Sequence, residues 1–119
     1  GATYIATHPD STCPAKECYI PDVGSFIKLL EETSKRTPDV IIGKPYSYII
    51  DDISKKLNVE KENITMVGDR LHTDILFGIN ANINTVLVLS GETSSDLAKT
   101  SPIKADLTLE DINVLKEYI

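Results

Sequence analysis

Two aspartates follow a short apolar run near the middle of the chain. Val67 and Gly68 lead directly into Asp69, and a second carboxylate, Asp74, falls where helical periodicity begins. Carboxylates about 4 Å apart repel each other by roughly 1 to 4 kcal/mol, and a divalent cation reverses that cost. Because oxygen-only ligands suit Mg²⁺, the pair predicts a magnesium site. Either aspartate alone has a simpler interpretation, as a turn residue or as a charge that complements a helix dipole.

A lysine stands at the end of another apolar run. Residues 40–42 are Val, Ile and Ile, and they are followed by Gly43, Lys44 and Pro45. A lysine fixed at a strand end offers a positive charge to a phosphoryl oxygen, or to the charge that develops during phosphoryl transfer. Lys44 is therefore a candidate catalytic residue, and a surface lysine in a turn is the alternative.

Short apolar runs alternate with segments of helical periodicity along the chain. This alternation is typical of β-α units that build a mostly parallel sheet flanked by helices, so the predicted fold class is α/β. We expect strands at residues 4–7, 40–42, 64–67, 85–89 and 106–107. In such a sheet, ligands bind beyond the carboxyl ends of the strands, which places Asp69 at the working edge.

Apolar residues at helical spacing predict two helices in the first half of the chain. The first covers residues 22–35, and the second is marked by apolar positions between 49 and 57 with a stop at Asn58. On the exposed side of the second helix we expect two charge pairs at i,i+4 spacing, Asp51 with Lys55 and Asp52 with Lys56.

Two further helices are predicted in the second half. One begins near His72, and the other closes the chain, where Thr108 and Asp111 fit a capping box. Residues 90–101 are rich in Ser, Thr and Gly, so we expect a loop around a short helical turn there.

Net charge limits the kinds of partner. The chain has 119 residues, of which 18 are acidic and 12 are Lys or Arg, and its net charge is -6. Such a chain would not neutralise a phosphate backbone, so nucleic acid is not an expected partner. No apolar run approaches the length of a membrane span, so no membrane partner is expected either.

Cys13 and Cys18 lie in a polar, Pro-containing segment, without a further pair of His or Cys residues that could complete a metal site. Free thiols of a cytoplasmic protein are the favoured interpretation, and a disulfide-closed loop in an oxidising compartment is the alternative. Gly1 opens directly into a strand-like run without a starting Met or a signal sequence. We therefore expect that the chain does not begin at a natural N-terminus.

The two strings that carry chemistry resemble, together, the third and fourth signature motifs of the haloacid dehalogenase (HAD) superfamily. Gly43-Lys44-Pro45 is followed by a helix, a strand and residues 68–78, GDRLHTDILFG, which is similar to the subclass with a large α/β cap. That subclass includes para-nitrophenyl, phosphoglycolate and pyridoxal phosphatases and nucleotide monophosphatases. The resemblance implies an incomplete HAD-like (Rossmann-like) fold, with residues 1–38 as the end of the cap and residues 39–119 as the C-terminal half of the core.

The resemblance also implies roles for individual residues. Asp69 would ligate Mg²⁺ directly. Asp74 would hold the residues that ligate the ion, or would contact the ion through a water. Lys44 would balance charge on the nucleophile and the phosphoryl group. The implied reaction hydrolyses a small phosphorylated metabolite by two in-line displacements through an aspartyl-phosphate intermediate. His8 lies in a segment similar to the cap segment that reaches over the active site, where Asn commonly stands. His8 is therefore a candidate substrate-binding residue, with a solvated loop histidine as the alternative.

The family's first motif, an Asp-x-Asp that supplies the nucleophile and the general acid/base, does not occur in this sequence. We therefore expect that the chain is the C-terminal part of a longer phosphatase and is inactive alone. In the family's sheet the nucleophile strand lies next to the strand at 64–67, which would be left here as an open edge. We expect the fragment to self-associate, to swap elements, or to cover this edge with residues 4–7 or another local segment.

Two other classes share some of these features. A receiver-type regulatory domain also combines acidic residues, Mg²⁺ and a Lys-Pro at a strand end. There the acidic pair comes first and the Lys-Pro last, which is the reverse of the order of Lys44 and Asp69. A non-catalytic phosphate-binding or metal-binding module that kept the phosphatase fold is the remaining alternative.

Overall fold

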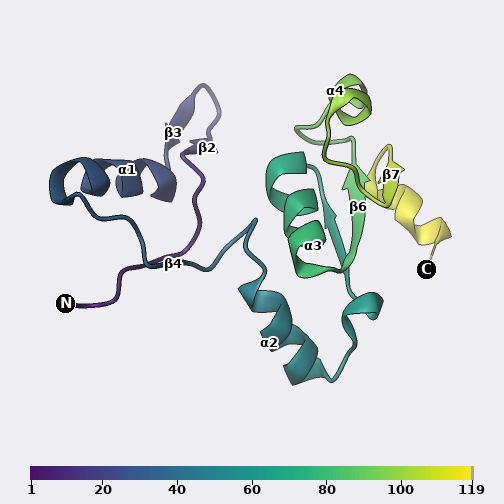
Figure 1. Ribbon diagram of the computed structural model, residues 1–119. Helices are drawn as coiled ribbons and strands as arrows, with labels where there is room; N and C mark the ends of the chain where they lie inside the picture. The colour runs from purple at the N-terminus through teal and green to yellow at the C-terminus, as the bar shows by residue number, and fades with distance from the viewer. Residues whose placement is uncertain (119) are drawn as a thin grey trace. The chain divides into compact units, whose positions relative to one another are not determined.

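The computed structural model describes residues 1–118 and folds them into two compact units. The first unit is Gly1–Gly43, and the second begins at Lys44 (Figure 1). Both contain parallel strands and helices, which confirms the predicted α/β class. The assignment of residues 1–38 to a cap and of residues 39–119 to a core stays a prediction.

The first unit is a strand-helix-strand arrangement with a hairpin inserted in it. Strands β1 (Ile5–Ala6) and β4 (Val40–Ile41) pair in parallel, and helix α1 (Val23–Ser34) connects them. Strands β2 (Thr12–Pro14) and β3 (Tyr19–Pro21) form the antiparallel hairpin, which the sequence did not predict. Every residue of the two hairpin strands is exposed, and the strands lack the alternation of apolar and polar residues by which a half-buried strand is recognised.

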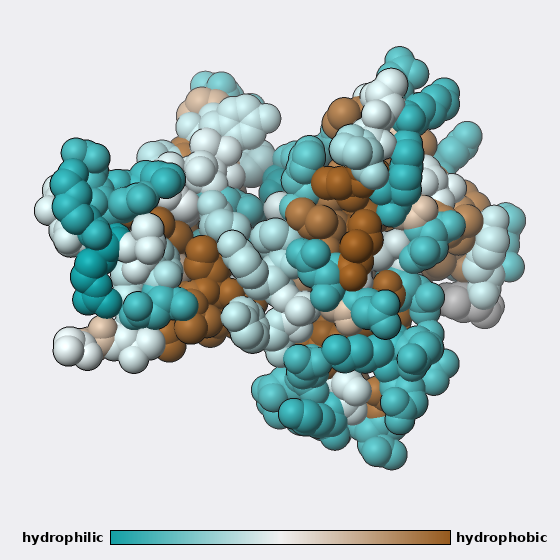
Figure 2. All heavy atoms as spheres, in the orientation of Figure 1, coloured by the Kyte–Doolittle hydropathy of each residue, from teal (hydrophilic) through white to brown (hydrophobic). Residues whose placement is uncertain are grey.

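Helix α1 confirms the predicted helix at 22–35, including its ends. Asp22 caps it, because its side chain accepts a hydrogen bond from the Val23 amide at 2.7 Å. Lys35 ends it in the left-handed conformation, with its amide bonded to the Glu31 carbonyl. The buried apolar side chain on this helix is Ile27. Figure 2 shows hydrophobic surface on this unit, where the exposed large apolar residues include Ile5, Phe26, Leu29 and Leu30.

The second unit is built on a parallel three-stranded sheet. Its strands are β5 (Thr65–Gly68), β6 (Asn84–Val88) and β7 (Leu107–Leu109), in the order β5-β6-β7 (Figure 1). All three were predicted, with boundaries shifted by a residue or two. The central strand β6 is the most deeply buried, as expected for a strand covered on both faces.

Helical segments cover this sheet and connect its strands. The α-helices are α2 (Tyr48–Leu57), α3 (Leu76–Ala81) and α4 (Ser95–Thr100), the 3₁₀ segments are η1 (Lys61–Asn63) and η3 (Ile112–Glu117), and η2 (Leu71–Ile75) is a π-helical turn. Helix α2 ends at Asn58 in the left-handed conformation, as predicted. The expected helical turn within residues 90–101 is α4.

The side chains of β6 alternate between two hydrophobic clusters. Leu87 packs with Leu71 and Ile75 of the π-helical turn on one face of the sheet. Val86 and Val88 pack on the other face, in a cluster that also includes Leu109 and, from η3, Val114 and Leu115. The sheet therefore lies between η2 and η3, and strand β5 also contacts η2.

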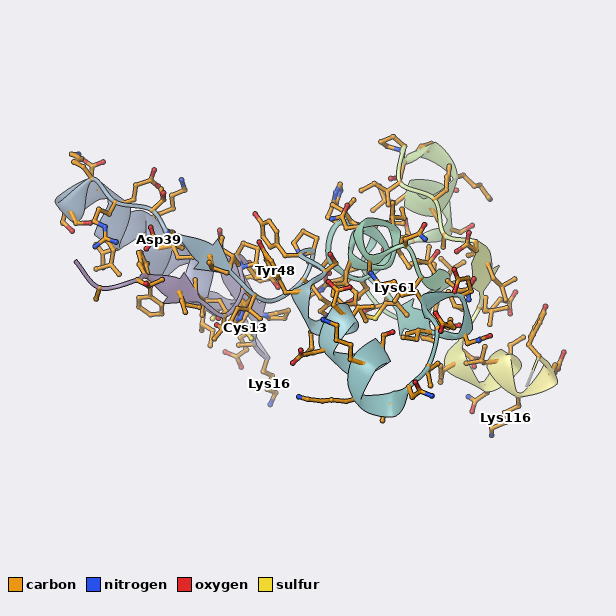
Figure 3. The ribbon with its side chains drawn as sticks, turned by 60° about the horizontal axis from the view of Figure 1, so that its bottom comes forward. Cys13, Lys16, Asp39, Tyr48, Lys61 and Lys116 are labelled. Atoms are coloured by element: carbon orange, nitrogen blue, oxygen red, sulfur yellow. The ribbon has the colours of Figure 1, made fainter. Side chains whose placement is uncertain are left out.

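Two predicted details are wrong. Thr108 lies inside strand β7, so it does not cap the last helix; Asp111 caps it, accepting from the Asn113 amide at 2.5 Å. Asp51 forms its ion pair with Lys61 at 2.7 Å, because η1 carries Lys61 back toward α2 (Figure 3). The predicted partner Lys55 contributes only a smaller Coulombic interaction, which lowers the pKa of Asp51 less than Lys61 does. The predicted pair of Asp52 and Lys56 is present at 3.4 Å.

Two expectations about the chain as a whole can be compared with the described residues. Cys13 and Cys18 are free and exposed, which agrees with the favoured reading of free thiols. Within residues 1–118, none of the helices combines the length and the apolar character needed to cross a membrane.

Candidate functional site

The two aspartates predicted to bind magnesium follow strand β5 in the second unit. Asp69 comes directly after the last strand residue, Gly68, and Asp74 lies in the π-helical turn η2. Asp69 is partly exposed, whereas Asp74 is 4% exposed. The two carboxylates are thus held by one short connection between β5 and α3, at the carboxyl end of the sheet where ligands bind in this class of fold.

A glycine at the end of β5 makes room for Asp74. A Cβ atom at Gly68 would lie 2.3 Å from the Cβ of Asp74, so no larger residue fits without a shift of the backbone. The amides of Asp74 and Ile75 both donate to the carbonyl of Arg70, at 3.0 and 3.1 Å. The second of these bonds widens the turn into a π-helix, a local form that is frequent at functional sites.

Lys44 is paired with the buried carboxylate. Its Nζ donates to Oδ1 of Asp74, and Oδ2 of Asp74 accepts from the Arg70 amide at 3.2 Å. The segment that carries Lys44 is anchored as well, because Asn80 of α3 donates to the Pro45 carbonyl at 2.8 Å. The peptide bond between Lys44 and Pro45 is cis. The structure therefore brings together two of the predicted site residues, Lys44 and Asp74, through direct contact.

Asp69 is held by the loop that follows β6. Its Oδ2 accepts from the Glu92 amide at 2.8 Å, and its backbone carbonyl accepts from the Thr93 amide at 3.2 Å. Among the described residues, Oδ1 of Asp69 has no hydrogen-bond donor. One carboxylate oxygen of Asp69 is thus fixed by a backbone amide of the protein.

The donor set fits a magnesium ion in part. The hard oxygen of Asp69 at a strand end suits Mg²⁺, which commonly takes one or two protein carboxylates and completes its shell with water and phosphate. Both oxygens of Asp74 are already engaged, which suits a residue that orients Lys44 better than a direct ligand. In residues 1–118 no three His, Cys, Asp or Glu side chains come close enough to hold a metal together.

His8 lies in the first unit and is bonded through both ring nitrogens. Its Nε2 lies 3.0 Å from Oδ1 of Asp22, and its Nδ1 lies 3.1 Å from the Thr7 hydroxyl. The pKa of Asp22 is lowered, first by the hydrogen bond from the Val23 amide and then by the bond to His8. His8 is therefore tied to the cap of α1 and is no freely solvated histidine. Its role in substrate binding stays a prediction.

Sequence reasoning missed the residues that hold the predicted ones. Asn80, Glu92 and Thr93 all form hydrogen bonds to the site or to the segment that carries Lys44, yet the sequence of residues 90–93 predicts only a loop. Two of these contacts come from backbone amides, which any non-proline residue provides, so no residue type signals them.

Comparison with known proteins places this chain in a family. The family model for HAD-hydrolase-like proteins matches residues 41–115, which include Lys44, Asp69 and Asp74. The chain therefore belongs to the haloacid dehalogenase superfamily of hydrolases, and the receiver-type alternative is excluded.

Its relatives are named as phosphatases. An acid sugar phosphatase of Staphylococcus haemolyticus is 32% identical over 114 residues, covering 96% of this chain and 43% of the relative. A 4-nitrophenylphosphatase structure from Thermotoga maritima matches with a TM-score of 0.93 and 44% identity, covering 98% of this chain and 45% of that one.

A third match includes a metal. The structure of a glycerol phosphate phosphatase from Mycobacterium tuberculosis in complex with magnesium matches with a TM-score of 0.86 and 26% identity, covering 97% of this chain and 35% of that one. In each of the three cases the chain spans less than half the length of the protein it matches.

Proposed function

We propose that this chain forms part of a magnesium-dependent phosphatase that hydrolyses small phosphate monoesters. The observation that carries the proposal is the contact of Lys44 with Asp74, on the turn that follows Asp69. Through this contact the ammonium group of Lys44 and the Oδ1 atom of Asp69 lie on neighbouring segments at the carboxyl end of a parallel sheet. The names of the relatives, which refer to acid sugar, 4-nitrophenyl and glycerol phosphate phosphatases, support a small phosphorylated metabolite as the substrate class.

Each of the three residues has a distinct proposed task. Asp69 offers Oδ1 to the metal, and Lys44 offers its ammonium group to the nucleophile and to an oxygen of the phosphoryl group. Asp74 holds Lys44 in place and compensates its charge while the site is empty of phosphate. Magnesium, when bound, neutralises negative charge on the group being transferred.

The nucleophile has to come from outside these residues. Phosphoryl transfer in this superfamily uses an Asp-x-Asp motif, and the sequence contains none. The reaction proposed for the longer protein proceeds through an aspartyl-phosphate, formed by in-line attack of the carboxylate on phosphorus with loss of the alcohol, and then hydrolysed by water. The chain alone is therefore expected to be inactive.

An activity assay tests the proposal directly. The longer protein is expected to hydrolyse para-nitrophenyl phosphate with Mg²⁺, and the purified chain is not. In the longer protein, Lys44→Ala and Asp69→Ala should each lower kcat/KM by about 10²-fold or more, as loss of a charge-stabilising group does elsewhere. Lys116→Ala, at an exposed lysine on η3, is the matched control and should leave activity unchanged (Figure 3).

Two results would count against this function. Metal-dependent turnover by the purified chain, abolished by Lys44→Ala, would mean that a nucleophile is present in it. Wild-type activity of the longer protein after Asp69→Ala would mean that Asp69 is not a metal ligand.

Metal binding gives a test that needs no turnover. We expect Mg²⁺ to bind this chain with millimolar affinity at best, because one or two carboxylates supply only part of an octahedral shell. Asp69→Asn should remove that binding, whereas Asp96→Asn, an exposed position on α4, should not. Tight binding that survives Asp69→Asn would place the metal elsewhere.

A further inference from the structure

Residues 90–93, which we term the strap, connect β6 with α4 and lie against Asp69. The Glu92 amide donates to Oδ2 of the Asp69 carboxylate at 2.8 Å, and the Thr93 amide donates to the Asp69 carbonyl at 3.2 Å. Thr93 is 3% exposed, so the strap is anchored in the unit at this point. Two successive amides thus fix both the backbone and the side chain of one aspartate.

The strap approaches Asp69 too closely for a side chain at Gly91. A Cβ atom built there would lie 1.9 Å from Oδ2 of Asp69 and 2.5 Å from its Cβ. Contacts below 3.0 Å do not occur for real Cβ atoms, so an alanine at this position must displace the carboxylate or the strap. The glycine therefore permits the contact that orients Asp69.

The side chain of Glu92 turns back to the residue that follows Asp69. Oε1 of Glu92 lies 2.5 Å from Nη2 of Arg70. This ion pair joins the strap to the loop after β5, at the residue that follows Asp69. The side chain of Arg70 is 32% exposed and that of Glu92 is 49% exposed, so this ion pair contributes little to the free energy of unfolding. Its geometry instead restrains the position of the Glu92 amide relative to the carboxylate.

We propose that Glu92 is a positioning residue for the metal ligand Asp69. Its carboxylate, paired with Arg70, holds the strap so that the Glu92 amide occupies Oδ2 of Asp69 and leaves Oδ1 for the cation. The proposal rests on the function proposed above for Asp69. In this role the Glu92 side chain acts through Asp69 and contacts neither the metal nor the substrate.

Two variants of the purified chain test this role by NMR. Glu92→Gln keeps the amide but removes the charge that binds Arg70, and Gly91→Ala forces a Cβ against Asp69. Glu110→Gln, an exposed glutamate after β7, is the control with the same chemical change. The measurements are hydrogen exchange of the Glu92 amide without metal, and the Kd for Mg²⁺ from chemical-shift changes of the amides near Asp69.

We expect faster exchange of the residue 92 amide in both variants, and a Kd for Mg²⁺ that is raised by about three- to tenfold. This lies below the usual range for residues that orient metal ligands, because the ion pair is half-exposed. Glu110→Gln should match the wild-type chain in both measurements. Urea unfolding of each variant shows that the fold is retained.

The outcomes separate this inference from the proposed function. Wild-type exchange and wild-type Kd in either Glu92→Gln or Gly91→Ala would overturn the role of the strap, while loss of binding in Asp69→Asn would still support the metal site. If Asp69→Asn binds Mg²⁺ like the wild-type chain, the proposed function is wrong. The exchange measurement needs no metal, so it decides whether the strap holds Asp69 in that case too.

Discussion

The ammonium group of Lys44 pairs with the carboxylate of Asp74, a residue that is 4% exposed and lies in the turn after β5. The two residues belong to different sequence motifs, and the ion pair couples them. A buried carboxylate without a partner is costly, because it loses its hydration and gains nothing in return. Lys44 is therefore a stabilising partner for Asp74 as well as a candidate catalytic residue, and its effect on stability can be measured.

Replacing Lys44 by a neutral residue should destabilise the chain. Lys44→Met keeps an unbranched side chain of similar length but leaves Asp74 with only the Arg70 amide as a donor. We expect a loss of about 1–3 kcal/mol in the free energy of unfolding, the usual cost of an unsatisfied buried acceptor. Urea unfolding measures it, and Lys116→Met, at an exposed lysine, should change it by less than about 0.5 kcal/mol.

The double variant Lys44→Met with Asp74→Asn distinguishes this explanation from a general effect of methionine. Neutralising Asp74 removes the unpaired charge, so the double variant should be more stable than Lys44→Met alone. Purely additive losses in the double variant would contradict a direct coupling between the two side chains.

A buried threonine joins strand β6 to the segment before β7. The hydroxyl of Thr85, which is 1% exposed, lies 2.7 Å from Oδ2 of Asp106 and accepts from the Asp106 amide at 2.9 Å. Thr85→Val keeps the shape of the side chain and leaves the Asp106 amide without that acceptor. We expect a loss of about 1–3 kcal/mol by urea unfolding. Thr108→Val, on the exposed face of β7, should change stability by less than about 0.5 kcal/mol.

Local patterns were sufficient to predict most of the elements of this fold. Strand β6 is a run of β-branched and apolar residues, and the Asn58 stop of α2 follows from the tolerance of asparagine for the left-handed conformation. Thr108 was placed wrongly because threonine suits both a strand and a helix cap, and pairing with β6 decided between them. Such choices depend on tertiary contacts that no local window contains.

The candidate site was predictable only in its residue types. The strings around Lys44 and Asp69 could be recognised, but the direct pairing of Lys44 with Asp74 joins segments thirty residues apart. The strap could not be predicted, because Asp69 is held by backbone amides whose positions depend on how β6 ends. The π-helical form of η2 also results from packing, since no single residue in it requires the wider turn.

The cap of helix α1 should make part of the stability depend on pH. The pKa of Asp22 is lowered from 3.8, chiefly by the hydrogen bond from the Val23 amide and secondly by His8. A lowered pKa in the folded state means that the stabilising contribution is present above the unfolded value and is lost as pH falls through the folded one. The free energy of unfolding of the wild-type chain should therefore fall in acid as Asp22 becomes protonated. An Asp22→Asn variant should lack this contribution to the fall, because its asparagine caps the helix without a charge.

Urea unfolding of both proteins over a series of pH values measures this difference. The advantage of the wild-type chain over Asp22→Asn should be present above pH 3.8 and should shrink as the pH falls below it. Titration of the Asp22 carboxyl by ¹³C NMR should give a pKa below 3.8 directly. A difference in stability that grows as the pH falls would contradict the assigned sign.

Strand β5 has one strand neighbour among the described residues. It pairs in parallel with β6, the central strand of the sheet in the second unit. Its outer edge therefore presents backbone groups to which no further strand is paired in the described part of the chain, next to partly buried apolar residues such as Val67. Such an edge is a template for pairing with another strand.

We therefore expect the chain to self-associate, with β5 of two copies meeting edge to edge. Light scattering over a range of concentrations should show a dimer that dissociates on dilution, since a net charge of -6 opposes association without satisfying the open amides. Thr65→Lys adds a charge at an exposed position of β5 and should shift the equilibrium toward monomer, whereas Thr100→Lys on α4 should not. A strictly monomeric wild-type chain with protected amides along β5 would mean that this edge is covered within one copy.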